Sequence, residues 1–255
     1  MSASRKYSHS RPLGHPNREP GQKPAKPADA AILIAWRKSR SAGVEVLMGR
    51  RTSRAAFLPS FFVFPGGRLD PLDYAVGIAT PLEPALTRSM GVRGNRRMAQ
   101  ALAVAAVRET FEETGLILGA HGDVGDLPQT DWQPWRSRSL APSLQHLHYF
   151  GRAITSPASP IRFNARFFIV HADRLEGELA GSGELSDLAF YAVDDVMQNK
   201  PIVDVTEFML TSLTNFADEP QHFYSAAPVF SYRGLAPFIR YEAISGITAT
   251  ADVTG

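Results

Sequence analysis

The sequence contains no cysteine, which excludes disulfide bonds, thiolate catalysis and zinc-thiolate sites. It also lacks any run of eighteen apolar residues, and its first twenty residues have no apolar segment of the secretory type. We therefore expect no membrane span, no membrane partner and no secretory signal. The absence of cysteine fits a reducing compartment, so the expected location is cytoplasmic.

Acidic residues are scarce at the N-terminus. Residues 1–28 hold six Lys or Arg and a single acid, Glu19, and they are rich in proline and poor in large apolar residues. This composition predicts a disordered basic tail. The remainder of the chain has more acids than bases, so nucleic acid is not the expected partner. An Arg- and Ser-rich tail also resembles a transit peptide, although its prolines disfavour an amphipathic helix.

The alternation of apolar and polar residues predicts short strands around one long helix. The helix spans 97–114, where no Gly or Pro occurs, and should end at Gly115. The expected strands are 30–37, 44–51, 61–64, 147–154, 162–170 and 187–193, with later helices at 194–199 and 203–213 and a final strand pair at 227–233 and 236–242. This mixture favours an α/β sandwich in a single domain, residues 29–255.

Acidic residues gather at the end of the long helix, in the segment RETFEETGL, residues 108–116. At 100° per residue, Glu109, Glu112 and Glu113 share one face, where they repel each other. A divalent cation such as Mg²⁺ or Mn²⁺ would relieve that repulsion. The alternative is an ion-paired surface turn, with Arg108 placed to pair with Glu112. The apolar stretch ALAVAAV before the acids favours a cleft over open solvent.

These residues resemble the signature of the Nudix hydrolase family, Gx5Ex7REUxEExGU, where U is a bulky apolar residue. RETFEETGL matches the second half of the signature, and FPGG (64–67) resembles the start of the first half, which Gly67 opens. Two departures are visible. Asp73 stands where the family has Glu, and residues 74–107 replace the usual seven, an insertion of 27 residues. The flanking segments extend the resemblance over about residues 30–200.

The resemblance implies a Nudix-type α/β/α sandwich with a mixed sheet, and metal-dependent hydrolysis of a diphosphate linkage in a small nucleotide-type molecule. A looser resemblance, carried by residues 47–67 and 161–168, points to the branch that cleaves coenzyme A and acyl-coenzyme A. ADP-ribose, a dinucleotide or a capped RNA end are alternative substrates. A non-catalytic Nudix-fold module that binds a nucleotide and regulates a partner is a further alternative, although such modules tend to lose the helix acids.

The resemblance also assigns roles to residues. The metal ligands would be Glu109, Glu112, Glu113 and the carbonyl of Gly66, and Arg108 would orient the carboxylates. Glu184 is the candidate general base, the alternative being a loop acid with no role. Candidate contacts to the substrate are Arg50, Arg51, Arg54, Arg166 and Gly67.

The resemblance does not assign a role to the insertion or to a pair of histidines. The insertion at about 74–95 is expected to form a lid or rim over the substrate pocket. His146 and His148 share a strand face, but no third ligand lies in register, so an ordinary pair of strand histidines is favoured. The oligomeric state stays open, a homodimer being one option.

Overall fold

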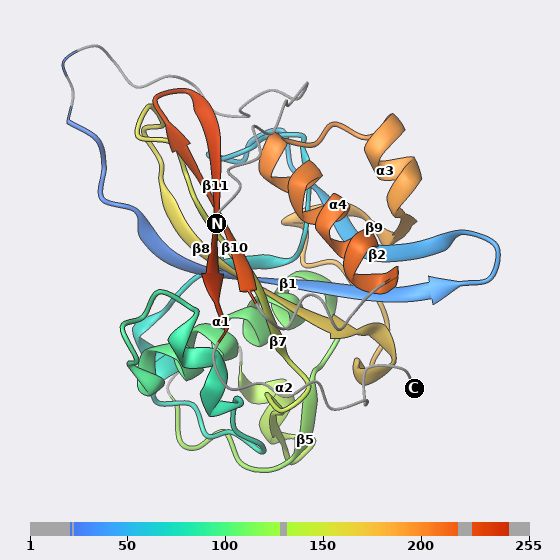
Figure 1. The fold of residues 1–255 in the computed structure, drawn as a ribbon. Helices are drawn as coiled ribbons and strands as arrows, with labels where there is room; N and C mark the ends of the chain where they lie inside the picture. The colour runs from blue at the N-terminus through green and yellow to red at the C-terminus, as the bar shows by residue number, and fades with distance from the viewer. Residues whose placement is uncertain (1–20, 22, 128–131, 219–225, 245–255) are drawn as a thin grey trace.

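The computed structural model describes residues 21, 23–127, 132–218 and 226–244, and most of the tail expected at 1–28 lies outside these ranges. A nine-stranded sheet crosses the molecule in the order β11-β10-β7-β8-β1-β2-β3, with β4 paired to β1 and β9 paired to β2. The pairs β1·β8 and β7·β10 are parallel and the others are antiparallel. The α/β class and the mixed sheet are therefore confirmed (Figure 1).

The elements lie close to their expected positions. The strands are β1 (Ala28–Ser39), β2 (Gly43–Arg51), β3 (Phe62–Val63), β4 (Gly66–Arg68), β5 (Gly119–His121), β6 (Leu140–Pro142), β7 (His148–Ile154), β8 (Phe163–His171), β9 (Leu185–Ala192), β10 (Ala226–Arg233) and β11 (Ala236–Ala243). The helices are α1 (Arg96–Thr114), α2 (Gln133–Arg136), α3 (Val193–Asn199) and α4 (Asp204–Asp218), with 3₁₀ turns η1 (Pro71–Tyr74), η2 (Pro84–Arg88) and η4 (Ala172–Arg174).

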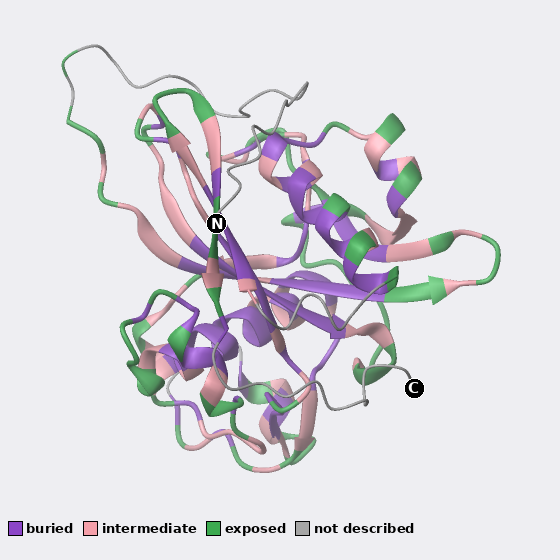
Figure 2. Ribbon diagram, viewed as in Figure 1, coloured by how far each residue is buried: buried purple, intermediate pink, exposed green. Residues whose placement is uncertain are grey.

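Two apolar cores lie on opposite faces of the sheet. Successive side chains of β1 point to opposite faces of the sheet. Leu33 belongs to the core that contains α1, and Ile34 belongs to the core that contains α4. Figure 1 shows α1 on one side of β1 and α3 and α4 on the other, and Figure 2 shows the buried residues concentrated along the strands and the inner faces of these helices. The result is a three-layer α/β/α sandwich.

Helix α1 carries the acidic segment to a fixed place. Its start is capped by Asn95, whose side chain accepts a hydrogen bond from the N–H of Met98, and its end is set by Gly115 in the left-handed region at φ 76°. The small residues between 99 and 107 are fully buried, which lets α1 approach the sheet closely. The glutamates in its last two turns are therefore held by a buried helix, as the sequence predicted.

The insertion does not form the expected lid. Its apolar residues Val76, Leu82, Leu86, Met90 and Val92 are buried in the core that surrounds α1. The segment is folded into η2 and a series of turns on the α1 side of the sheet, where Figure 1 shows it in cyan to green beside that helix. The insertion thus covers the long helix, because its apolar residues have a larger area to bury there than at a solvent-exposed rim.

A buried hydrogen-bonded pair fastens α4 to β10. The hydroxyl of Tyr232 donates to the carboxylate of Asp204, with oxygen distances of 2.8 and 2.9 Å, and Asp204 is almost fully buried. Burial, with the charge of Asp204, raises the pKa of Tyr232. The phenol therefore stays protonated and continues to donate at neutral pH.

We expect Tyr232→Phe to lower the free energy of unfolding by about 1–3 kcal/mol, because a buried carboxylate loses a donor. Urea unfolding followed by circular dichroism measures this change. Tyr241→Phe is the matched control, since Tyr241 lies on the neighbouring strand β11 with 57% of its surface exposed. Equal midpoints for the two variants would contradict the role given to the pair.

Where the described residues overlap the predicted tail, the C=O of Ala25 accepts a hydrogen bond from Arg162, and β1 begins at Ala28. No helix among the described residues is both long and apolar enough to cross a membrane.

Candidate active site

The site is built where β1 changes its antiparallel partner. Residues 30–32 of β1 pair with β4, and residues 36–39 pair with β2. In β4, Gly66 adopts a φ of 153°, and a Cβ on it would lie 2.5 Å from the C=O of Ala31. A residue with a side chain cannot fit there without moving the central strand, so the glycine is a requirement of the backbone.

The peptide of Gly66 faces the helix glutamates. The N–H of Leu33 donates to the C=O of Pro65, so in this pairing the N–H and C=O of Gly66 point away from β1. The N–H of Gly66 accordingly donates to Oε2 of Glu113 at 2.9 Å. One backbone turn and the end of α1 are thus held together across 47 residues of sequence.

Gly67 is needed for a different reason. A Cβ on Gly67 would lie 2.3–2.4 Å from the carboxylate atoms of Glu109. The absence of a side chain at position 67 therefore makes the space in which Glu109 lies.

We expect Gly67→Ala to fold, because the clashing group is the movable end of a side chain, and to displace Glu109. Catalytic turnover should fall by about 10- to 100-fold, the effect typical of disturbing the support of a metal site. Steady-state kinetics and thermal unfolding measure the two effects separately. Gly43→Ala, at the start of β2 with open space around it, tests whether loss of a glycine away from the site gives the same kinetics.

Arg108 organises the acids around it. Its Nε and Nη2 donate to the two oxygens of Asp73 at 2.8 and 3.1 Å, and Nη2 also donates to the C=O of Arg68. Its Nη1 donates to Glu109 at 2.9 Å and to both oxygens of Glu112 at 3.0 and 3.2 Å. Asp73 thus reaches Arg108 although 34 residues lie between them, and the inserted segment leaves this contact intact.

Burial and repulsion dominate the electrostatics of the glutamates. Burial raises the pKa of Glu113 to about 8, and the charges of Glu109 and Glu184 add to the rise, while the Gly66 N–H and Arg51 oppose it. Burial also raises the pKa of Glu109, against the influence of Arg108. Burial alone would lower the pKa of Arg108, but the surrounding acids raise it. Without a cation, Glu113 is therefore largely protonated at neutral pH.

The glutamates open onto a cavity of about 550 Å³ on the α4 side of β1. We call it the glutamate cavity. Its polar lining consists mainly of Gly66, Gly67, Glu109, Glu112, Glu113 and Glu184, together with Arg51 and Arg68. The rest of the wall is mainly apolar and includes Phe57, Leu58, Phe64, Ile161, Phe163, Phe167 and Val205.

The donor set suits a hard divalent cation, since four carboxylates line one cavity and two of them have raised pKa values. In the described part of the chain, however, no three acidic or histidine side chains converge as they would around a bound ion. Glu109 and Glu112 are turned toward Arg108, and Glu113 toward Gly66. The residues fit a cation provided that these carboxylates rotate from their present partners.

Known proteins are similar to this chain in sequence and in fold. No family model matches the chain. The acyl-coenzyme A diphosphatases NUDT19 of Gallus gallus and Xenopus laevis are 31% and 28% identical to it over 99 and 102 residues, about a third of this chain, and these matches span only 26% and 27% of the relatives. The crystal structure of a NUDIX hydrolase from Alicyclobacillus acidocaldarius is 28% identical, covers 74% of this chain and 92% of its own, and superimposes with a TM-score of 0.59. In sequence and in fold, this chain is therefore similar to Nudix hydrolases.

The structure brings together only some of the arginines predicted to contact substrate. Arg51 lines the glutamate cavity, and its Nε is buried with no hydrogen-bond partner in the described structure. Arg50 and Arg54 do not line the cavity. The prediction that Arg166 contacts substrate is wrong, because this residue is only 1% exposed. It donates to the C=O of Met90 and pairs with Asp29, so it fixes the insertion on the opposite face of the sheet.

The predicted acids and glycines lie at the cavity. Glu184 is exposed and lines the cavity, and its charge contributes to the raised pKa values of Glu109 and Glu113. Its assignment as the base stays a prediction, as does the role of Gly67 toward substrate. His148 is partly buried, and burial and the charge of His146 lower its pKa, which is consistent with an ordinary strand histidine.

Sequence reasoning missed part of the wall. Arg68 lines the cavity, and its guanidinium lies 5.4 Å from the ring of Phe163. Its position directly after Gly67 was an available signal. Val205 and Thr206, at the start of α4, also line the cavity, but nothing in their sequence indicates that α4 folds back against this site.

Proposed function

We propose that this protein hydrolyses a diphosphate linkage in a small nucleotide-type molecule, with coenzyme A or an acyl-coenzyme A as the first candidates. The observation that carries the proposal is the glutamate cavity, whose lining combines four carboxylates and two arginines with a mainly apolar wall. Such a pocket suits a substrate that joins a diphosphate to a long, partly apolar group.

One comparison and one structural feature support the choice of substrate. The curated relatives are named acyl-coenzyme A diphosphatases, and the matched segments are about 30% identical to this chain. The aromatic pair Phe57 and Phe163, with ring centroids 5.0 Å apart, gives the cavity an apolar surface beside Arg68. The acyl chain of an acyl-coenzyme A is an apolar group that such a wall would contact.

Mg²⁺ or Mn²⁺ is the proposed cofactor, held by Glu109, Glu112, Glu113 and the carbonyl of Gly66. When bound, the cation neutralises phosphate oxygens and lowers the pKa of the attacking water. The chain itself supplies the rest. Arg51 would bind a phosphate oxygen, and Glu184 would take the proton from water as its oxygen bonds to phosphorus. One P–O bond of the diphosphate bridge breaks, and each product retains one of the two phosphates of that bridge.

The experiment that tests the proposal is a substrate panel. Purified protein is incubated with Mg²⁺ or Mn²⁺ and coenzyme A, an acyl-coenzyme A, ADP-ribose, NADH, a diadenosine polyphosphate or capped RNA, and the products are identified by mass spectrometry. We expect cleavage of coenzyme A compounds at the diphosphate. Preferential cleavage of another compound would support the hydrolase activity but reject coenzyme A as the substrate. Turnover of none of the compounds would favour the non-catalytic regulator.

A further inference from the structure

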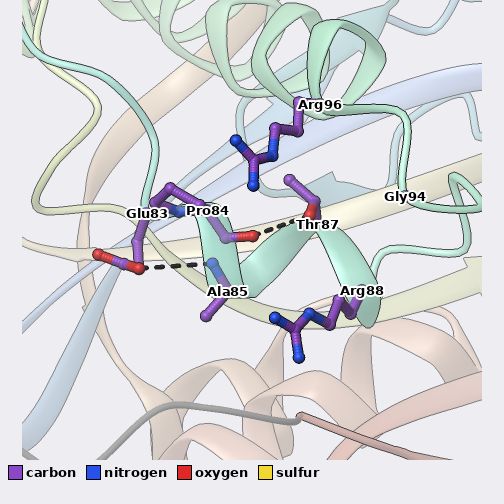
Figure 3. Close-up of a pocket in the computed structure, with 7 residues that line it drawn as sticks. All are labelled: Glu83, Pro84, Ala85, Thr87, Arg88, Gly94 and Arg96. Atoms are coloured by element: carbon purple, nitrogen blue, oxygen red, sulfur yellow. Dashed lines mark hydrogen bonds between the residues drawn. The ribbon is translucent and has the colours of Figure 1, made fainter.

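A second pocket lies in the inserted segment, apart from the glutamate cavity. It has a volume of about 390 Å³ and is lined by Glu83, Pro84, Ala85, Thr87, Arg88, Gly94 and Arg96. We call it the insertion pocket. Figure 3 shows Arg96 reaching from the start of α1 toward η2, with Arg88 extending from the end of that turn. None of these residues lines the glutamate cavity.

The insertion pocket has two solvent-exposed cations, Arg88 and Arg96, that have no ionic partner among the residues the structure describes. Neither Arg88 nor Arg96 forms an ion pair or a side-chain hydrogen bond with another described residue. The acid that lines the pocket, Glu83, is engaged with its own turn, where its Oε1 accepts from the N–H of Ala85 at 3.4 Å. Two guanidinium groups against one carboxylate leave the pocket with a net positive charge.

The backbone adds to that charge. Arg96 is the first residue of a 19-residue helix, whose N-terminal end is electropositive because its peptide dipoles align. Asn95 satisfies the N–H of Met98 but not those of the two residues before it. Hydroxyl groups contribute little, since Thr87 already donates to the C=O of Pro84. The guanidinium forks and the helix end together match the oxygens of a phosphate group.

We propose that the insertion pocket binds a small phosphate-bearing anion through Arg88 and Arg96. The site is distinct from the proposed catalytic one, because Arg96 and Glu109 are thirteen residues apart on α1, which separates them by about 20 Å along the helix. Both sites nevertheless stand on the same helix, one at each end. An anion bound at Arg96 therefore contacts the element that carries the glutamates.

The test is a titration of the full-length ¹⁵N-labelled protein with inorganic phosphate, without divalent cations and at low ionic strength, followed by amide shifts of residues 83–97. Arg88→Gln and Arg96→Gln should each weaken binding about fivefold, the effect of removing one nearby unit charge at a solvated site. Glu83→Gln should strengthen it, because it removes the opposing charge and keeps an oxygen to accept from Ala85. Arg93→Gln, exposed but outside the pocket lining, should leave it unchanged.

Two comparisons of ligands complete the test. AMP should shift the same amides as phosphate, and adenosine should shift none of them, since the phosphate is the recognised group. The proposal is overturned if phosphate leaves these amides unmoved, if chloride at equal ionic strength produces the same shifts, or if adenosine binds as AMP does. It is also overturned if Arg93→Gln weakens binding as much as Arg88→Gln, or if Glu83→Gln fails to strengthen it.

Discussion

Glu113→Gln should reduce metal-dependent turnover by about 1,000-fold while the protein remains folded. Electrostatic stabilisation by a bound cation is worth several kcal/mol, and each 1.36 kcal/mol is a factor of ten in rate. A glutamine amide keeps an oxygen that can accept from the Gly66 N–H, so the contact between β4 and α1 survives. Because burial already holds the pKa of Glu113 near 8, a neutral group costs the fold little.

Two measurements separate loss of the metal from loss of the fold. In the wild type, adding Mg²⁺ or Mn²⁺ should raise the melting temperature, since a ligand that binds only the native state stabilises it. Glu113→Gln and Glu112→Gln should melt normally without metal but lose this rise together with turnover. Glu178→Gln, on an exposed acid outside the cavity lining, is the matched control. Full activity in the Glu113 variant would remove this residue from the metal site.

The elements that were predictable are those whose signal is local. Helix α1 follows from an uninterrupted run of good helix formers, and its end follows from a glycine that adopts φ 76°. The strands β1, β2 and β8 follow from their apolar residues. The shared face of the three glutamates follows from helical geometry alone. For these features the local preference and the tertiary structure agree.

The features that were not predictable depend on contacts between distant segments. Arg166 sits beside residues that do line the cavity, yet strand alternation sends its side chain to the opposite face, where it pairs with Asp29. A sequence that shows an arginine on a strand does not say which face will hold the site. The position predicted for the insertion was wrong for a similar reason. Its apolar residues are scattered singly along the sequence, and only in the folded chain do they pack together in the core around α1.

Asp73→Ala should lower the free energy of unfolding by about 3 kcal/mol, the second large effect we expect. The side chain of Asp73 is completely buried and accepts three hydrogen bonds, two from Arg108 and one from the N–H of Asp70. Removing one partner of a buried ion pair typically costs 3–5 kcal/mol, because the other charge loses its compensation. The lower end applies here, since Arg108 keeps its bonds to Glu109 and Glu112.

The same variant tests how the split signature works. With Asp73 gone, Arg108 is free to turn fully toward Glu109 and Glu112, which would hold these carboxylates away from a cation. Turnover should therefore fall and the metal concentration for half-maximal activity should rise, beyond what lost stability explains at a temperature where the variant is folded. Asp70→Ala is the control: it removes a cap of the same turn, worth about 1 kcal/mol, without touching Arg108. If the two variants have the same urea midpoint and the same metal titration, Asp73 acts only as part of the turn. In that case the first half of the signature, separated from the second by the insertion, no longer contributes to the site.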